Sequence, residues 1–230
     1  MERSEILLLP FAAVLLFAAD NLPWQKPESQ WGTSDAKQIL EDSPWAKSVK
    51  LQHVRYLSEF ERRDSGNWEA DIGPSIGLAA LEGLFGGVGL SEAIQRSHRF
   101  PDFGSVTVRW ESALPVRAAH DKLGVSGEGA RSAGYYIIAV YGINAPRRWN
   151  IASELKGIAV LRRLNKKDIK PARVEIVRRP DGLSNVLYLF PRSEITSRDS
   201  VLQFVAQIGE LFLAQNFVTA DMQFHERLEL

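Results

Sequence analysis

One short segment of the chain has the spacing of a serine nucleophile. Gly73, Ser75 and Gly77 form a G-x-S-x-G match, which in α/β hydrolases is a strained turn that presents the serine between a strand and a helix. The preceding residues 66–71 (GNWEAD) lack the apolar pattern of a strand. A Ser hydrolase that uses Ser75 is therefore kept only as an alternative, and the sequence favours a Gly/Ser loop.

Two further matches lack the partners that their chemistry requires. Ser153 and Lys156 form an S-x-x-K match, but the companion motifs S-D-N and K-T-G of penicillin-binding proteins are absent. Ser153 also suits the capping of a helix. The glycines in 83–89 are not followed by the lysine of a phosphate-binding loop. Neither match predicts a catalytic residue, and the sequence favours a protein without enzymatic activity.

The chain offers few ligands for a metal ion. It contains no cysteine, which excludes disulfides, cysteine nucleophiles, iron–sulfur clusters and cysteine-bound zinc. Its histidines are not spaced as i, i+4 pairs or in an H-E-x-x-H frame; they are His53, His98, His120 and His225. We expect surface or capping histidines, no metal and no cofactor.

A basic block is the candidate binding site. Residues 147–179 contain eleven basic and three acidic residues, a local charge of 11 − 3 = +8. Such a block can hold an anionic polymer or an anionic lipid surface. The alternative, which the sequence favours, is that strand alternation scatters these charges or pairs them with the acidic residues of 193–230. The predicted binding residues are Arg147, Arg148, Arg162, Arg163, Lys166 and Lys167.

The overall composition is that of an ordinary globular protein. Of 230 residues, 45% are apolar and 24% are charged, which argues against a disordered, collagen-like or multi-span membrane chain. Lys+Arg and Asp+Glu both number 28, so the formal net charge is zero. No nucleic acid partner is expected from this balance.

The N-terminus predicts export. Residues 6–19 (ILLLPFAAVLLFAA) are uncharged and apolar, shorter than the roughly 18–20 residues of a comfortable membrane span and of the length of a signal-peptide core. The flanking Arg3 is accompanied by Glu2 and Glu5, so the leading segment is not clearly positive. We expect a periplasmic or extracellular protein; an uncleaved membrane anchor over 6–19 and a buried helix are the alternatives.

The rest of the N-terminal half is expected to be helical and then irregular. A helix begins near Thr33 or Ser34, which can cap it, and ends before Pro44, and a second helix follows over 45–63. Residues 65–104 are rich in glycine and predict a loop. The predicted organisation is a signal peptide or anchor (1–20), a Trp-containing helical segment (21–64), a Gly-rich linker (65–104) and an α+β domain (105–230).

The C-terminal half carries the clearest strand and helix patterns. Apolar and polar residues alternate over 105–111, which predicts a half-buried strand, and the apolar run 135–141 predicts a central one. Helices are expected from Pro115 to Leu123 and from Asn150 or Ser153 through Arg163. Strands are expected over 172–178, 185–190, 201–208 and 211–224. This order predicts an α+β fold, a mixed, largely antiparallel sheet with two helices on one face.

Four tryptophans lie in the N-terminal part of the chain. An exposed face of tryptophans stacks sugars or anchors a partner. The alternative, which we favour, is that they dock the short helices on the C-terminal sheet. These residues are Trp24, Trp31, Trp45 and Trp68.

Two stretches carry a resemblance to known proteins. Residues 31–47 (WGTSDAKQILEDSPWAK) and 109–115 (RWESALP) resemble a set of uncharacterised exported bacterial proteins. The resemblance supports export and implies no activity or site residue. The sequence thus predicts an exported envelope protein that acts by binding or assembly. Its partner would be an unknown envelope protein or an anionic polymer or lipid.

Overall fold

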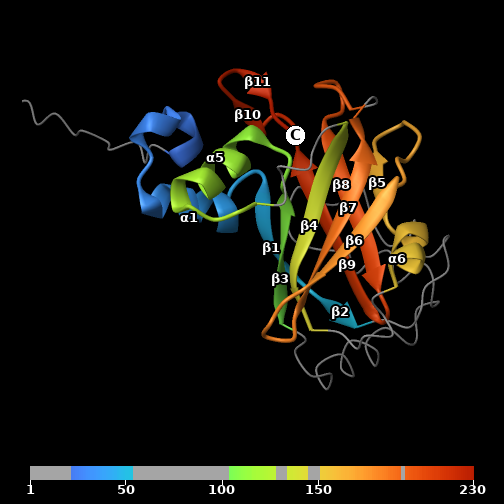
Figure 1. The fold of residues 1–230 in the computed structure, drawn as a ribbon. Helices are drawn as coiled ribbons and strands as arrows, with labels where there is room; N and C mark the ends of the chain where they lie inside the picture. Colours follow the sequence, from blue (N-terminus) through green and yellow to red (C-terminus); the bar gives the residue numbers. More distant parts are fainter. Residues whose placement is uncertain (1–21, 54–103, 128–133, 145–150, 193–194) are drawn as a thin grey trace, which may run out of the picture.

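Two antiparallel sheets form the body of the protein (Figure 1). The computed structural model describes residues 22–53, 104–127, 134–144, 151–192 and 195–230. The five-stranded sheet has the order β1 (Ala46–Lys50), β3 (Ser105–Trp110), β4 (Tyr135–Ile143), β7 (Ser184–Pro191), β6 (Arg173–Arg178). The four-stranded sheet has the order β2 (Gln52–His53), β9 (Leu211–Val218), β8 (Val201–Ile208), β5 (Val160–Arg163).

The α+β class is confirmed, with a different arrangement from the expected single sheet. All named strand pairs in the two sheets are antiparallel. The helices α5 (Leu114–Leu123) and α6 (Ala152–Ile158) do not share a face: α5 packs against α1 (Thr33–Glu41), whereas α6 packs against β6 and β8. The strands form two sheets that bury apolar faces against each other, as Trp110 on β3 and Phe217 on β9 do.

The strand patterns of the C-terminal half placed the centre of the larger sheet correctly. Strand β4 lies between β3 and β7 and is buried on both faces. Ile138 and Val140 belong to the main core, and Ile137 and Ala139 belong to a smaller cluster on the opposite face. A strand with two buried faces reads as a continuous apolar run.

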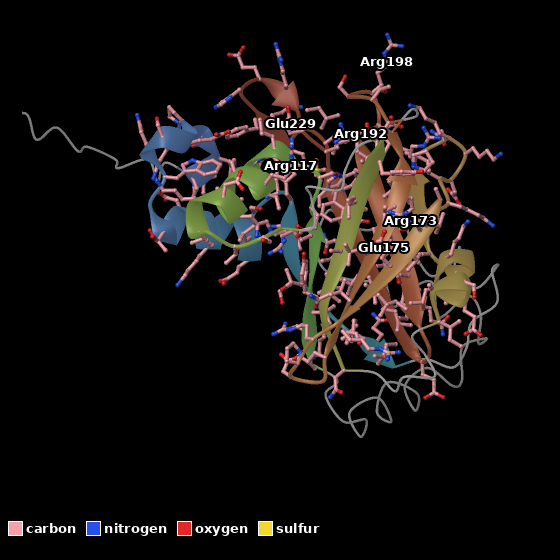
Figure 2. All side chains as sticks on the ribbon, viewed as in Figure 1. Arg117, Arg173, Glu175, Arg192, Arg198 and Glu229 are labelled. Carbon is pink, nitrogen blue, oxygen red and sulfur yellow. The ribbon has the colours of Figure 1, made fainter. Side chains whose placement is uncertain are left out.

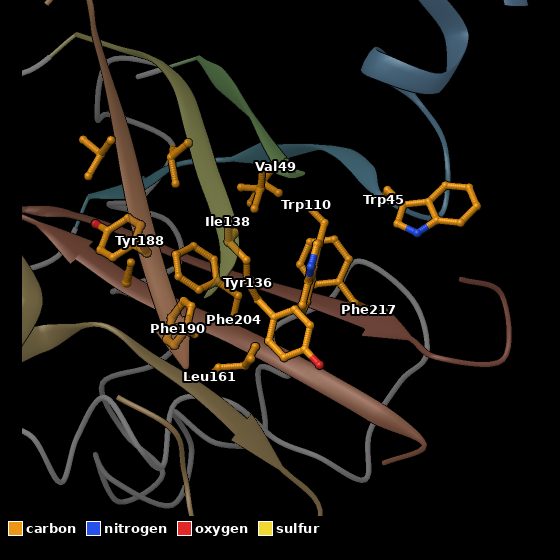
Figure 3. Close-up of a cluster of buried hydrophobic side chains, with 14 of the residues drawn as sticks. Trp45, Val49, Trp110, Tyr136, Ile138, Leu161, Tyr188, Phe190, Phe204 and Phe217 are labelled. Carbon is orange, nitrogen blue, oxygen red and sulfur yellow. The ribbon is translucent and has the colours of Figure 1, made fainter. Parts of the chain in front are cut away.

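Aromatic side chains fill the main core between the sheets (Figure 3). The ring of Trp110 meets Phe217 edge-on with centroids 5.3 Å apart, and Tyr188 meets Phe204 at 5.1 Å. All four residues are buried. Such edge-to-face pairs add to the area that these rings bury, so they hold one sheet against the other.

Both long sides of the two-sheet body are covered. On one side β1 leads through Leu51 directly into β2, so the chain passes from the larger to the smaller sheet. On the other side α6 packs against β6 and β8 and buries Leu155 and Ile158. Covered sides prevent uncontrolled pairing of edge strands.

The N-terminal segment is docked by tryptophans. Trp31 Nε1 donates to the carbonyl of Pro23 at 2.8 Å, and Trp45 Nε1 donates to the carbonyl of Glu229 at 2.7 Å. Trp31 and Trp45 are both buried, and their rings contact Phe224. The segment comprises the 3-10 turns η1 (Pro23–Gln25) and η2 (Glu28–Gln30) and α1. Trp68 lies outside the described residues.

The first predicted helix is confirmed. The second, predicted over 45–63, is wrong for residues 46–53, and its remainder (54–63) lies outside the described residues. Helix α1 spans Thr33–Glu41, but its N-cap is Gly32, whose N–H donates to the Asp35 carboxylate at 2.9 Å. Residues 46–53 form β1 and β2 instead of a helix. Pairing with β3 and burial of Val49 and Leu51 outweigh the helix-like spacing of their apolar residues.

The helix expected to run through Arg163 is too long. Helix α6 ends at Ile158 and β5 begins at Val160, so Arg162 and Arg163 lie on a strand rather than at a helix end. Helix α5 is as expected, with Pro115 in its first turn, and it stops at Gly124, whose φ is 65°. The Gly-rich linker lies almost wholly outside the described residues. No helix among the described residues is long and apolar enough to cross a membrane.

The turn between β10 (Gln223–Phe224) and β11 (Arg227–Leu228) gives a stability prediction. Its two residues, His225 and Glu226, have φ of 49° and 63°, a conformation that costs free energy for residues other than glycine. We expect Glu226→Gly to raise the free energy of unfolding by about 0.5–1 kcal/mol. Urea unfolding measures it. The control Arg227→Gly should lower stability, and an E226G protein no more stable than wild type would contradict the prediction.

Candidate functional site

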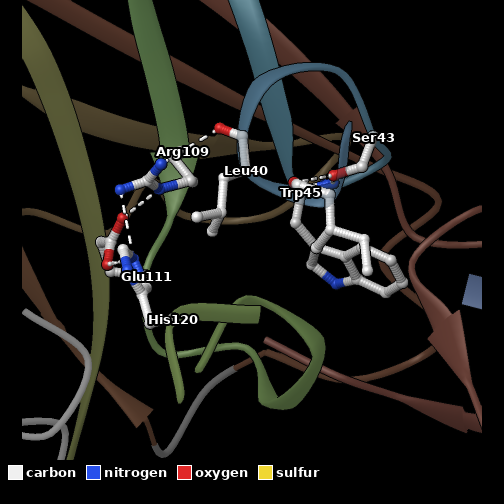
Figure 4. Close-up of polar contacts among 7 residues, drawn as sticks. Leu40, Ser43, Trp45, Arg109, Glu111 and His120 are labelled. Atoms are coloured by element: carbon white, nitrogen blue, oxygen red, sulfur yellow. Dashed lines mark hydrogen bonds and ion pairs between the residues drawn. The ribbon is translucent and has the colours of Figure 1, made fainter. Parts of the chain in front are cut away.

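The described residues contain a buried cluster of charged side chains that sequence analysis missed. Arg109 is the fifth residue of β3, Glu111 follows the end of that strand, and His120 lies on α5. Their exposed fractions are 8%, 0% and 7%. Figure 4 shows the three side chains converging beside the end of α1. We call them the Arg–Glu–His cluster.

The geometry of the cluster is a chain of polar contacts. Arg109 Nε donates to Glu111 Oε1, and Arg109 Nη1 donates to the carbonyl of Leu40 at 3.1 Å. His120 Nε2 lies 3.3 Å from Glu111 Oε2 and 3.2 Å from Arg109 Nη2. The carboxylate therefore contacts a side chain on its own strand and one on α5, and the arginine reaches on to α1.

Tyr141 closes the cluster from β4. The Arg109 guanidinium carbon lies 4.3 Å from the centre of the Tyr141 ring, a cation–π contact. Burial and the negative charge of Glu111 raise the pKa of the Tyr141 hydroxyl. The phenol thus stays neutral, and the ring serves as an apolar and π-rich wall for the arginine.

The charges in the cluster stabilise each other. Burial raises the pKa of the Glu111 carboxyl, but the contacts with His120 and Arg109 outweigh burial, and its pKa lies below the ordinary value. Burial lowers the pKa of Arg109, and the carboxylate of Glu111 more than offsets it. Glu111 and Arg109 are therefore charged at neutral pH, as a buried ion pair whose partners cannot be removed singly without large cost.

The histidine has one ring nitrogen in the cluster and one outside it. Nε2 either donates to Glu111 or accepts from Arg109, because one nitrogen cannot do both. Nδ1 is buried and has no hydrogen-bond partner among the described residues. The backbone of Gly127 lies directly against the ring: a Cβ built there would be 2.5 Å from His120 Cδ2.

The cluster joins the two stretches 31–47 and 109–115. Arg109 and Glu111 belong to 109–115, and the Leu40 carbonyl belongs to 31–47. The N–H of Trp110 also donates to the carbonyl of Trp45 at 2.7 Å, and Ser43 Oγ accepts from the N–H of Trp45 at 3.2 Å. These contacts give both stretches a shared structural role.

The predicted basic binding residues do not form one exposed patch among the described residues. Arg162 is buried and donates to Gln203 Oε1 at 2.9 Å, and Arg163 is buried and donates to the carbonyl of Lys167 at 2.7 Å. Lys166 Nζ lies 2.8 Å from Asp199 Oδ1, and the Lys167 side chain is exposed. Arg147 and Arg148 lie outside the described residues. Binding through this block stays a prediction.

Most other candidate residues fall outside the described residues or are apart from each other. Ser75 and His98 are not among the described residues. Ser153 and Lys156 are exposed on α6, and His225 stacks on Phe224 with centroids 4.0 Å apart. The described residues contain no group of three or more His, Cys, Asp or Glu side chains that could hold a metal ion.

One sequence signal pointed toward the cluster. Arg109 and Glu111 are two residues apart at the end of an alternating strand, so they share one face of the sheet. The alternation predicted that this face is exposed. The face is instead covered where α1 and α5 pack together. The contacts of Arg109 with Leu40 and His120 join residues far apart in the sequence, so local spacing does not predict them.

Comparisons with protein-family models, with curated proteins and with solved structures find no match to this chain.

The lowered pKa of Glu111 gives a pH-dependent prediction. Because this pKa is lower in the folded than in the unfolded chain, the carboxylate stabilises the fold fully above its unfolded pKa. The contribution is lost as pH falls through the lowered folded value. Glu111→Gln should therefore cost about 3 kcal/mol at pH 7, and the gap to wild type should narrow in acid. Urea unfolding across pH measures both, and a gap that does not change with pH would contradict this assignment.

The close approach of Gly127 gives a steric prediction. Gly127→Ala places a methyl group against the His120 ring and should lower the free energy of unfolding by about 1–3 kcal/mol. The matched control is Gly157→Ala on α6, where an added Cβ meets no atom within 4 Å; alanine favours the helix there. Chemical denaturation of both variants should give opposite signs. Equal effects would show that the ring is not confined by this backbone.

Proposed function

We propose that this chain is an exported protein of the bacterial envelope that acts by binding or assembly rather than by catalysis. The proposal rests on one observation: the side chains of the Arg–Glu–His cluster are buried and link structural elements to one another. Its carboxylate and guanidinium contact groups from α1, β3 and α5, and all three side chains are at least nine-tenths buried. Residue types that elsewhere perform acid–base chemistry are engaged here in joining elements.

The start of the described chain supports export. The folded structure begins only a few residues after the apolar run 6–19, because the Pro23 carbonyl accepts a hydrogen bond from Trp31 Nε1. Removal of residues up to about position 20, as expected of a signal peptide, would leave in place the contacts that the N-terminal segment makes among the described residues. If the run were an uncleaved anchor, the folded body would begin within a few residues of the bilayer.

Two alternatives remain proposals of lower rank. A binder of anionic lipid or polymer is favoured by the exposure of Lys167 and of other basic side chains at the same end of the body. A hydrolase using Ser75 has no support in the described residues, since Ser75 is not among them. A partner among envelope proteins is compatible with the proposal and is not specified by it.

Cell fractionation with intact mass measurement tests the proposal. We expect an envelope species shortened by about 20 residues, or a full-length species in the membrane fraction if the run is an anchor. The matched control is Leu8→Arg/Leu15→Arg, which interrupts the apolar run and should leave full-length protein in the cytosol. Full-length, cytosolic wild-type protein would contradict export. Turnover of ester or glycoside substrates by the purified protein would contradict the absence of catalysis.

A further inference from the structure

We infer that one end of the two-sheet body is a docking surface for an anionic lipid bilayer. The surface consists of residues 163–170 between β5 and β6 and of Arg192 and residues 195–199 between β7 and β8; we call it the basic rim. Figure 1 shows these loops at the upper edge of the body. The inference deepens the proposed envelope function by naming a partner, and it rests on that function for its biological setting.

The basic rim is a built structure rather than two independent loops. Lys166 Nζ contacts Asp199 Oδ1 at 2.8 Å and so joins one loop to the other. Asp199 is 4% exposed, and its second oxygen accepts from the N–H of Thr196 at 2.9 Å. The carbonyl of Lys167 accepts from the Arg163 guanidinium at 2.7 Å. These internal contacts fix the backbone from which the outward side chains project.

The outward charge of the basic rim is positive. The described residues of the rim include six basic and two acidic side chains, a net charge of 6 − 2 = +4. One acidic residue, Asp199, is buried and occupied with Lys166. Lys167 and Arg198 are exposed and make no ion pair with another described residue. Figure 2 shows Arg198 pointing away from the body at this end, with Arg192 below it. Such side chains attract the headgroups of anionic lipids.

An apolar side chain favours a bilayer over a soluble anion. Leu164 is 46% exposed, one of four large apolar side chains exposed among the described residues, and it lies two positions before Lys166. Next to it Asn165 has φ of 55°, so the loop turns sharply at this point. An exposed leucine gains free energy on entering a lipid interface, while neighbouring lysines remain with the headgroups. A soluble polyanion offers no apolar phase.

The N-terminal segment enters the body at the same end. In the strand register, Ala46 pairs with Arg109, Trp110 with Ile138, and Tyr135 with Pro191. The start of β1 and the end of β7 thus lie at one end of the sheet. The first described segment and the basic rim therefore connect to the same end of the larger sheet. The opposite end has Lys50 and Arg178 exposed.

The absence of cysteine makes a site-specific test possible. The full chain carries a single cysteine, as Leu164→Cys on the basic rim or Lys50→Cys at the opposite end, labelled with an environment-sensitive fluorophore. Vesicles contain either phosphatidylcholine alone or phosphatidylcholine with phosphatidylglycerol. We expect a blue shift of emission at position 164 with the anionic vesicles only, reversed by salt, and no shift at position 50.

Charge-reversal variants distinguish binding through the basic rim from nonspecific electrostatic attraction of the whole protein to anionic vesicles. Lys167→Glu/Arg198→Glu in the Leu164→Cys chain should weaken the response to anionic vesicles roughly tenfold or more. The control Lys50→Glu/Arg178→Glu changes the net charge equally and should leave the response nearly unchanged. Equal shifts at both labels, equal shifts with both vesicle types, or equal loss in both charge variants would overturn the inference.

The remaining outcome identifies a different ligand. A change in emission with soluble polyphosphate and none with vesicles would overturn the lipid partner and assign the rim to a polymer. These measurements use purified protein, so they stand whether or not fractionation confirms export. A cytosolic protein that passes the vesicle test would refute the proposed location alone, and an exported protein that fails it would refute the docking surface alone.

Discussion

The buried carboxylate of Glu111 is the constraint on which the N-terminal half of the fold depends. A carboxylate with no exposed surface must have charged or hydrogen-bonding partners, and here they come from Arg109 and His120. Arg109 in turn satisfies the carbonyl of Leu40 near the end of α1. One ionic requirement thus fixes the positions of α1 and α5 relative to β3, and removing any partner leaves another unsatisfied.

The apolar contacts around the cluster depend on the same arrangement. Once α1 is held beside β3, Trp45 lies where its indole reaches the carbonyl of Glu229, and Phe224 packs against Trp45 and Trp31. The last residues of the chain therefore close over the first described ones. The described helical segment, the two sheets and the C-terminal hairpin share one continuous core. The described N-terminal segment is therefore packed as part of the body.

Elements that are determined by local sequence patterns could be predicted from the sequence, whereas contacts between distant residues could not. Alternation and apolar runs located β3 and β4, and Pro115 located α5. The residues of β1 and β5 were predicted to be helical because the spacing of their apolar residues fits a helix as well as a strand. Pairing with β3 and with β8 makes them strands. The Arg–Glu–His cluster needed knowledge of which helix covers the outer face of β3. The basic block was visible as charge, but its division into buried and exposed members follows from tertiary contacts such as Lys166 with Asp199.

Native-state hydrogen exchange of an Arg109→Met protein tests the central role of the cluster most directly. This change removes the contacts with Glu111 and Leu40 while keeping an unbranched apolar stem. The account predicts that amides of α1 and α5 lose protection together, by local opening, while those of β8 and β9 keep the wild-type rates. Unchanged protection in α1, or an equal loss of protection throughout both sheets, would contradict it.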